Sequence, residues 1–302
     1  MEWNRQPCDY ETVCRVTSEL GKDCSYFQRQ IYGKSLCRRE LILLSAENHA
    51  ETERQRVLIA AAFHGMEWIT TAILLHFAQR LSFAAERGET LQGIDAAMAL
   101  RRSRPIFVPC VNPDGVEIQL HGMQAAEEYA KLVEQVSHGD TEHWQTNARG
   151  VDINHNFNAH WHRLRQMEEE NGICGPAKTR YGGEFPESEP ESHCLAELTR
   201  HSNVGCVLAL HSQGEEIYHG FDGYVPPNSM QMAQRLAQVS GYTLAQPEGL
   251  ASCGGFKDWF VCKFGRPGFT IELGKGVNPL PIAQFDEIYR KAEPMLMQAL
   301  LL

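Results

Sequence analysis

Short apolar runs alternate with stretches of helical periodicity along most of this chain. Val57–Phe63 and Val204–Leu210 have the length and composition of buried strands, and Phe269–Ile271 is a shorter run of the same kind. The remaining periodicity predicts helices over 7–21, 68–80, 230–240 and 281–301, and strands over 40–46 and 106–111. This alternation, without internal repeats, predicts an α/β fold with helices that cover a sheet.

Between these elements the chain carries turn and loop signals. The strand that begins at Ile106 should end in the Asn112–Gly115 turn, and the acidic segment 124–136 predicts a helix inserted on the surface. Residues 168–190 are rich in Gly, Pro and Glu and predict a loop that walls the active site, with Glu168–Glu170 as a solvated turn. Ser188-x-x-Glu191 with its Pro predicts the start of a helix that runs to about residue 202.

Composition narrows the class of protein. With 302 residues, 43% of them hydrophobic, the chain can bury one large core, and we expect a single catalytic domain over residues 1–302. The net charge of −10 argues against nucleic acid as a partner. No apolar run approaches the ~20 residues that cross a bilayer, and the N-terminal residues lack a signal pattern. Ten Cys without a Cys-x-x-Cys pair predict reduced thiols and a cytoplasmic protein; the oligomeric state stays open.

Candidate chemistry lies at the ends of the three apolar runs. His64 and Glu67 follow the first run, His211 follows the second and Glu272 ends the third. Open α/β sheets place their sites at such strand ends. A catalytic zinc takes three His or carboxylate ligands and leaves a fourth position for water, and a further carboxylate must move the proton of that water. His64, Glu67 and His211 are therefore the candidate ligands of one zinc ion, and Glu272 is the candidate base.

Each signal alone has a simpler explanation. A lone His among 13 is more often a surface or hydrogen-bonded residue, and Glu272 could be a charge at a strand end in a salt bridge. His160-Trp-His162 resembles a metal pair, but it has no third partner and is interpreted as surface. Only the ordered set of four residues, each at an apolar strand end, favours a metal site.

The order of the motifs resembles the zinc carboxypeptidase family, whose members are the carboxypeptidase A-like metallopeptidases. The similarity covers most of the chain. It rests on Gly33-Lys-Ser35 with Arg39, His64-x-x-Glu67, Asn112-Pro-Asp-Gly115, Gly150-Val-Asp-Ile-Asn154, Ser188-Glu-Pro-Glu191, the His211 segment and Thr270-Ile-Glu272-Leu. Three stretches, 63–71, 211–218 and 266–276, look like the bacterial γ-D-glutamyl-L-diamino acid peptidases, which trim cell-wall peptides.

The resemblance implies a fold and a set of roles. It implies a three-layer α/β/α domain whose mixed sheet has about eight strands. His64, Glu67 and His211 would bind zinc, and Glu272 would act as general base and then as acid. Asp152 matches an aspartate that hydrogen-bonds the first zinc histidine and fixes its orientation; without the resemblance it is equally well a turn aspartate.

Departures from the family pattern bear on the substrate. Family members have Asn-Arg-Asn where this chain has Asn154-His155-Asn156, and their arginine grips the C-terminal carboxylate of the substrate. A histidine at position 155 weakens that clamp because it lacks the charged bidentate fork. The family's tyrosine shortly before the Gly-Gly segment is also missing, since Leu250-Ala-Ser252 fills its place.

Two other cations could take over the missing contact. By the resemblance, Lys257 aligns with the family position at the floor of the leaving-group pocket, where it would suit the second carboxylate of diaminopimelate. It could also be a solvated lysine paired with Asp258 or Glu248. Arg149 is a candidate for a substrate carboxylate or for the oxyanion. Asn154, His155, Arg149 and Lys257 are thus the predicted substrate-binding residues.

The sequence therefore predicts a zinc peptidase that hydrolyses γ-D-glutamyl–diaminopimelate or a similar amide in small, murein-derived peptides. A zinc deacylase of N-acyl amino acids would share His-x-x-Glu and a later His, but the similarity outside the zinc motif argues against it. An ordinary metallocarboxypeptidase acting on peptide C-termini stays open, as does a non-catalytic relative that binds peptides.

Overall fold

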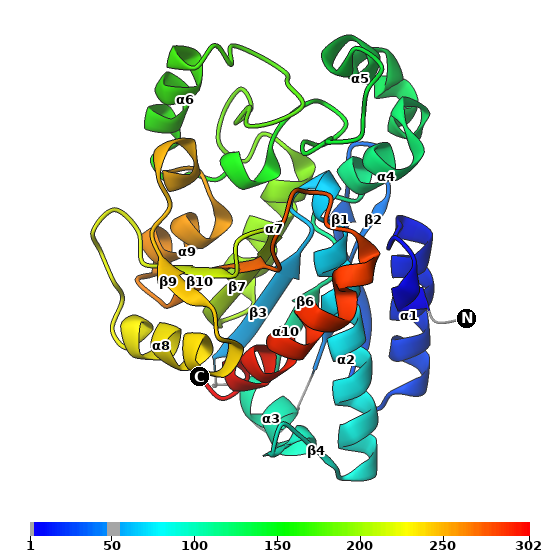
Figure 1. The fold of residues 1–302 in the computed structure, drawn as a ribbon, viewed down its shortest axis with the longest axis vertical. Coiled ribbons are helices and arrows are strands. Elements are labelled where there is room, and N and C mark those ends of the chain that lie inside the picture. Colours follow the sequence, from blue (N-terminus) through cyan, green and yellow to red (C-terminus); the bar gives the residue numbers. More distant parts are fainter. Residues whose placement is uncertain (1–2, 47–54) are drawn as a thin grey trace.

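A computed structural model describes residues 3–46 and 55–302 of the chain. Its main feature is an eight-stranded sheet with the spatial order β1-β2-β6-β3-β7-β10-β8-β9 (Figure 1). The strands are β1 (Gln28–Lys34), β2 (Glu40–Ser45), β3 (Arg56–Ala61), β6 (Ile106–Val108), β7 (Val204–Ser212), β8 (Glu216–His219), β9 (Thr243–Ala245) and β10 (Gly268–Leu273).

The sheet is mixed, as predicted. Its centre, β6-β3-β7-β10, is parallel, whereas β1, β2 and β8 run antiparallel to their inner neighbours. Strand β9 pairs parallel to β8 at the edge. The central strands are apolar because both of their faces are covered by helices. Strands β4 (Thr90–Leu91) and β5 (Ile94–Asp95) form a separate small hairpin.

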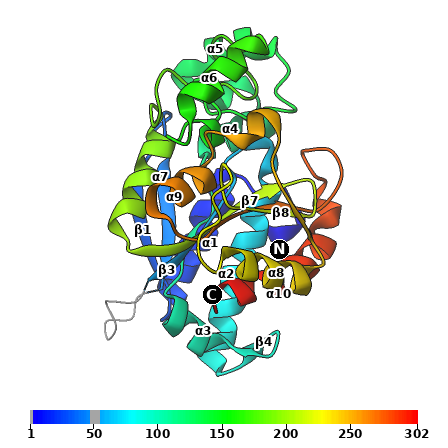
Figure 2. The same ribbon diagram turned by 90° about the vertical axis from the view of Figure 1, so that its left-hand side faces the viewer.

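Helices cover both faces of the sheet (Figures 1 and 2). On one face, α1 (Tyr10–Asp23), α2 (Ile69–Arg87), α8 (Ser229–Ser240) and α10 (Phe285–Ala299) bury their apolar sides in one core cluster, together with part of α3 (Ala96–Ser103). On the other face, α7 (Pro190–His201) and α9 (Phe256–Phe264) form a second cluster. Alternate residues of β3 belong to the two clusters, Ile59 to the first and Leu58 to the second, as the pleat of a strand requires. The predicted three-layer α/β/α fold is confirmed.

A third group of elements lies beyond the carboxyl ends of the central strands, at the top of Figure 1. It comprises α4 (Pro113–His121), α5 (Ala130–Ser137) and α6 (Trp161–Glu170) with their loops. The single surface helix predicted over 124–136 is wrong in detail. A 3-10 segment, Met123–Tyr129, precedes α5, and the backbone breaks at Glu127, where φ is 52°. The segment is also partly buried, because Ala126 and Val133 pack with Trp144 in a small core of their own.

The solvated turn predicted at 168–170 is also wrong, because these residues form the last turn of α6. Glu168 has no exposed surface and accepts hydrogen bonds from Arg165 and from the backbone N–H of Gly182. Three consecutive glutamates suggest a solvated segment, but helical geometry turns one of the three toward the interior. The helix predicted to start near Ser188 exists as α7, with Glu189 at its N-cap position.

With one exception, the remaining predictions of elements are confirmed within a few residues at each end. The exception is the helix predicted at 68–80, because α2 continues to Arg87. None of the ten cysteines is in a disulfide, and six of them are buried as small side chains. Among residues 3–46 and 55–302, no helix combines the length and the hydropathy that a membrane span requires.

Candidate metal centre and its cavity

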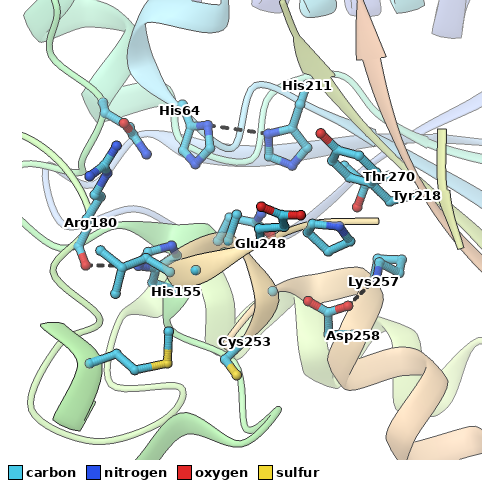
Figure 3. A pocket seen from close by; sticks show the side chains of 18 of the residues that line it. His64, His155, Arg180, His211, Tyr218, Glu248, Cys253, Lys257, Asp258 and Thr270 are labelled. Atoms are coloured by element: carbon cyan, nitrogen blue, oxygen red, sulfur yellow. Dashed lines mark hydrogen bonds and ion pairs between the residues drawn. The ribbon is translucent and has the colours of Figure 1, made fainter. Parts of the chain in front are cut away.

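Three side chains from distant parts of the chain meet at the carboxyl ends of β3 and β7. His64 Nδ1 lies 3.0 Å from Glu67 Oε1, and His211 Nδ1 lies 3.1 Å from Glu67 Oε2. The two imidazole Nδ1 atoms are 3.3 Å apart, and Figure 3 shows the rings facing each other. Within the described residues this is the one group of His, Cys, Asp or Glu side chains that could hold a metal ion.

The local backbone explains why His64 and Glu67 meet. Strand β3 ends at Ala61, Ala62 adopts a left-handed φ of 49°, and a 3-10 turn over Gly65–Glu67 returns the Glu67 carboxylate toward the His64 ring. Gly65 is required there, because a Cβ atom at this position would lie 2.2 Å from the carbonyl oxygen of Gly115. His211, the last residue but one of β7, approaches from the neighbouring strand.

The spacing of these atoms suits a tetrahedral ion. Two ligands at about 2.0–2.1 Å from a tetrahedral zinc lie about 3.3 Å from each other. The three separations of 3.0, 3.1 and 3.3 Å are close to that value. Two imidazoles and one carboxylate are also the donor set of catalytic zinc sites, which keep the fourth position open. The residues present therefore fit a zinc ion.

Asp152 supports the first histidine. Its Oδ1 lies 3.2 Å from His64 Nε2 and accepts the backbone N–H of Asn154 at 3.0 Å. Its Oδ2 accepts the side-chain amide of Gln145 at 2.6 Å and the backbone N–H of Arg180 at 3.2 Å. The carboxylate is fully buried, so these contacts fix its position and, through it, the orientation of the His64 ring.

Burial and neighbouring charges shift the pKa values of the three candidate ligands. Burial alone would raise the pKa of Glu67, but the two imidazoles lower it to about 2. Burial would likewise lower the pKa of His64, whereas the carboxylates of Glu67 and Asp152 raise it well above its ordinary value. Burial also lowers the pKa of His211, which keeps this ring in the neutral form that binds metals.

Glu272 stands beside the two histidines. Strand β10 pairs in parallel with β7, so that Glu272 lies in register with His211. No hydrogen bond or ion pair is formed by its carboxylate within 3–46 and 55–302, and the residue lines the same cavity as His64 and His211. Burial, and then the charge of Glu67, raise its pKa well above the ordinary value. A carboxylate held in this way is suited to accept and release a proton.

A cavity of about 590 Å³ opens in front of these groups. Three of the four predicted substrate-binding residues, Asn154, His155 and Lys257, line it. Arg149 does not. It lines a separate cavity of about 160 Å³ and pairs with Glu189 at 3.0 Å, so its charge is directed away from the candidate metal centre.

Lys257 and Asp258 form a buried ion pair on the cavity wall (Figure 3). Lys257 is 3% exposed and also donates to the carbonyl oxygen of Gly220 at 2.8 Å. Burial raises the pKa of Asp258, and the Lys257 ammonium opposes that shift. The lysine is therefore paired with Asp258, one of the two partners considered from the sequence, yet it is not a solvated surface residue.

His155 is held by α6 and by the loop that follows it. Its Nδ1 lies 2.8 Å from the carbonyl oxygen of Arg180 and 3.1 Å from Glu168 Oε1. Burial would lower its pKa, but the carboxylates of Asp152 and Glu168 raise it. One ring nitrogen is thus committed to the protein, and His155 cannot reproduce the two-pronged grip of an arginine.

Several residues of the cavity were not predicted as site residues. Arg180, Tyr218, Gln145 and Thr270 all line it. Tyr218 lies in a segment that the family resemblance includes, but Arg180 belongs to an irregular loop with no motif of its own. Its position follows from hydrogen bonds to Asp152 and His155, which the sequence does not reveal. His160, in contrast, is near Asp222 and away from the metal centre.

Comparisons with known proteins agree with this geometry. The sequence profile of the zinc carboxypeptidase family matches residues 15–294. The chain is 34% identical over 300 residues to γ-D-glutamyl-L-diamino acid endopeptidase 1 of Lysinibacillus sphaericus, covering 99% of this chain and 73% of that protein.

Two solved structures share the fold. Carboxypeptidase A of Helicoverpa armigera superposes with a TM-score of 0.73 at 22% identity, over 99% of this chain and 75% of that one. Murein-tripeptide amidase of Escherichia coli O157 gives a TM-score of 0.55 at 22% identity, over 89% of this chain and 91% of that one.

Proposed function

This chain belongs to the zinc carboxypeptidase family and is a metallopeptidase, and on that basis we propose that it cleaves the amide bond between γ-D-glutamate and diaminopimelate in murein-derived peptides. A similar protein, from Lysinibacillus sphaericus, is named for γ-D-glutamyl-L-diamino acid cleavage. Murein-tripeptide amidase of Escherichia coli O157, which shares the fold at 22% identity, is named for a substrate of the same class.

The proposed roles follow from the positions of the side chains. His64, Glu67 and His211 would hold one zinc ion, and Asp152 orients His64. Zinc, when bound, acidifies water and polarises the scissile carbonyl. Glu272 takes a proton from the attacking water, whose oxygen bonds to the carbonyl carbon. It then delivers this proton to the leaving nitrogen, so that the C–N bond breaks and a carboxylate and an amine are released. Asn154 and His155 line the cavity wall against which the substrate lies.

The Lys257–Asp258 pair is the observation that carries the substrate proposal. An apolar side chain in the leaving position would gain nothing from a buried ion pair, and a lysine side chain would meet the like charge of Lys257. The far end of diaminopimelate carries both an ammonium and a carboxylate. These two groups can pair crosswise with Asp258 and Lys257, which compensates the desolvation of all four charges.

The test uses the purified protein loaded with zinc. We expect hydrolysis of L-Ala-γ-D-Glu-meso-diaminopimelate, with free diaminopimelate identified by mass spectrometry. The same peptide ending in L-lysine should be a poorer substrate, because Lys257 repels its ammonium. A set of ordinary peptides tests C-terminal trimming, and N-acetyl-aspartate tests deacylation. Trimming of ordinary peptides without release of diaminopimelate would refute the substrate assignment.

A further inference from the structure

Besides the two histidines of the candidate metal centre, three basic side chains in the described part of the chain line the cavity: His155, Arg180 and Lys257. Two of them already have acidic partners. Lys257 is paired with Asp258, and His155 is directed through Nδ1 toward Glu168 and a backbone carbonyl. Arg180 is different, because its guanidinium makes no hydrogen bond or ion pair within residues 3–46 and 55–302, and its side chain is exposed.

The backbone of Arg180 is nevertheless fixed. Its N–H donates to Asp152 Oδ2 at 3.2 Å, and its carbonyl oxygen accepts from His155 Nδ1 at 2.8 Å. Between these bonds the residue adopts a left-handed φ of 70°. A non-glycine residue rarely adopts that region and persists there only where its surroundings impose it. Asp152, which orients His64, therefore also determines where the Arg180 side chain leaves the backbone.

We infer that Arg180 binds a carboxylate of the substrate next to the scissile amide, which makes it a specificity-determining residue of the reaction proposed above. The guanidinium fork matches a carboxylate in a bidentate pair, a contact that a histidine at position 155 cannot make. Figure 3 shows Arg180 near His64, on the other side of the view from the Lys257–Asp258 pair. The two charged contacts would thus hold different parts of one peptide.

The charges around the cavity make such a contact necessary. Glu170, Glu248 and Glu272 also line the cavity, so its wall repels an anionic peptide wherever no cation is near. An acidic substrate can then bind only where a cation of the wall meets one of its carboxylates. Within the described part of the chain, Arg180 is the cavity cation whose charge no protein carboxylate already neutralises.

Two carboxylates of the proposed substrate flank the scissile amide. One is the α-carboxylate of the D-glutamyl residue, which the γ-linkage leaves free. The other belongs to the diaminopimelate centre that carries the scissile nitrogen. Both present the same chemistry to a guanidinium, and replacing one of them at a time by its amide identifies the one that Arg180 binds.

The experiment measures binding and turnover separately. In a Glu272→Gln background, calorimetry with L-Ala-γ-D-Glu-meso-diaminopimelate should show that Arg180→Met weakens binding by about 10- to 100-fold. Arg180→Lys should lie between the two, because it keeps the charge and loses the fork. In the active enzyme, Arg180→Met should raise KM more than it lowers kcat. Arg163→Met removes an exposed arginine of α6 that does not line the cavity, and its effect should stay within about twofold.

The two amidated peptides supply the decisive comparison. With Arg180 present, amidation of the contacted carboxylate should weaken binding by about as much as Arg180→Met does. In the Arg180→Met variant that amidation should have little further effect. If both amidations cost the same with and without Arg180, the inference is wrong, even where the parent peptide is cleaved and the proposed function stands. If the parent peptide is neither bound nor cleaved, both the function and the contact are refuted.

Discussion

Two groups of buried carboxylates differ in what surrounds them. The first group, Glu67 and Asp152, faces imidazole rings at the candidate metal centre. The second group, Asp114, Glu189 and Glu191, lies under the start of α7 and is equally buried. The imidazoles lower the pKa of Glu67 to about 2, whereas burial and then the nearby carboxylates of Asp114 and Glu189 raise the pKa of Glu191 to about 8.

Burial is common to both groups, so their neighbours decide the direction of the shift. Glu191 accepts the backbone N–H of Leu36 at 3.2 Å and the side-chain amide of Asn147 at 3.3 Å, and neither donor is a cation. A cation of this region, Arg39, forms an ion pair with Asp114 instead, at 2.7 Å. The first group is thus arranged to remain charged and to hold a cation, and the second contains a glutamate that is best buried as a neutral acid.

The largest effect is expected at Glu272, which is only half-buried and faces the cavity. Glu272→Gln keeps the size of the side chain and removes its ability to accept a proton. Turnover should fall by about 10²–10⁴-fold while the zinc content is unchanged. Rates on the murein tripeptide and elemental analysis of the same preparation test this. A variant with near-normal turnover would exclude Glu272 as the base.

A substitution at Glu67 would remove a charged carboxylate from the first group. Glu67→Gln replaces a charged ligand by a neutral amide between the two histidines. Loss of a residue that only hydrogen-bonds a metal ligand usually lowers metal affinity by about 10- to 100-fold. Glu67→Gln changes a ligand itself, so zinc affinity should fall by more than that. Competition with a chromogenic chelator measures this affinity. Zinc binding equal to that of the unmodified protein would show that the ion is held elsewhere.

A smaller effect is expected at Asp152, which touches His64 but would not touch the ion. Asp152→Asn preserves the shape, and the loss of charge should lower zinc affinity by about 10- to 100-fold. The same chelator titration applies. Since Gln145 and Arg180 are bound to the same carboxylate, circular dichroism of the variant should show that the fold is retained.

The smallest effect, on stability, concerns the second group. Because the pKa of Glu191 is about 8 in the folded state and its ordinary value is 4.5, the folded state binds more protons between these pH values. The free energy of unfolding should therefore decrease as the pH rises from 4.5 to about 8. Glu191→Gln cannot ionise and should flatten this decline, which raises the melting temperature at pH 8 by about 2–4 °C per kcal/mol recovered.

Exposed Glu169 provides the control for that measurement. Its side chain is 64% exposed, so Glu169→Gln should follow the pH dependence of the unmodified protein. A Glu191→Gln variant whose stability declines with pH as steeply as that of the control would show that Glu191 does not take up the proton. The difference between the two groups of carboxylates would then need another cause.

Much of the fold and of the metal centre could be predicted from the sequence. The apolar runs that end before His64 and His211 predicted β3 and β7, because a strand buried on both faces must be apolar throughout. The spacing of His64 and Glu67 indicated one turn after a strand, and the structure has that turn. The eight strands came from the family resemblance, since edge strands as short as β9 leave little pattern.

The tertiary structure alone decided which loop arginine faces the cavity. The sequence offered Arg149 as a candidate, but Arg149 pairs with Glu189, and Arg180 lines the cavity instead. The sequence also gave no sign that Glu168 is buried against His155. The physical reason is that local periodicity records which face of an element is apolar. The direction of a loop side chain and the pKa of a buried acid, in contrast, depend on partners that are distant along the chain and close in space.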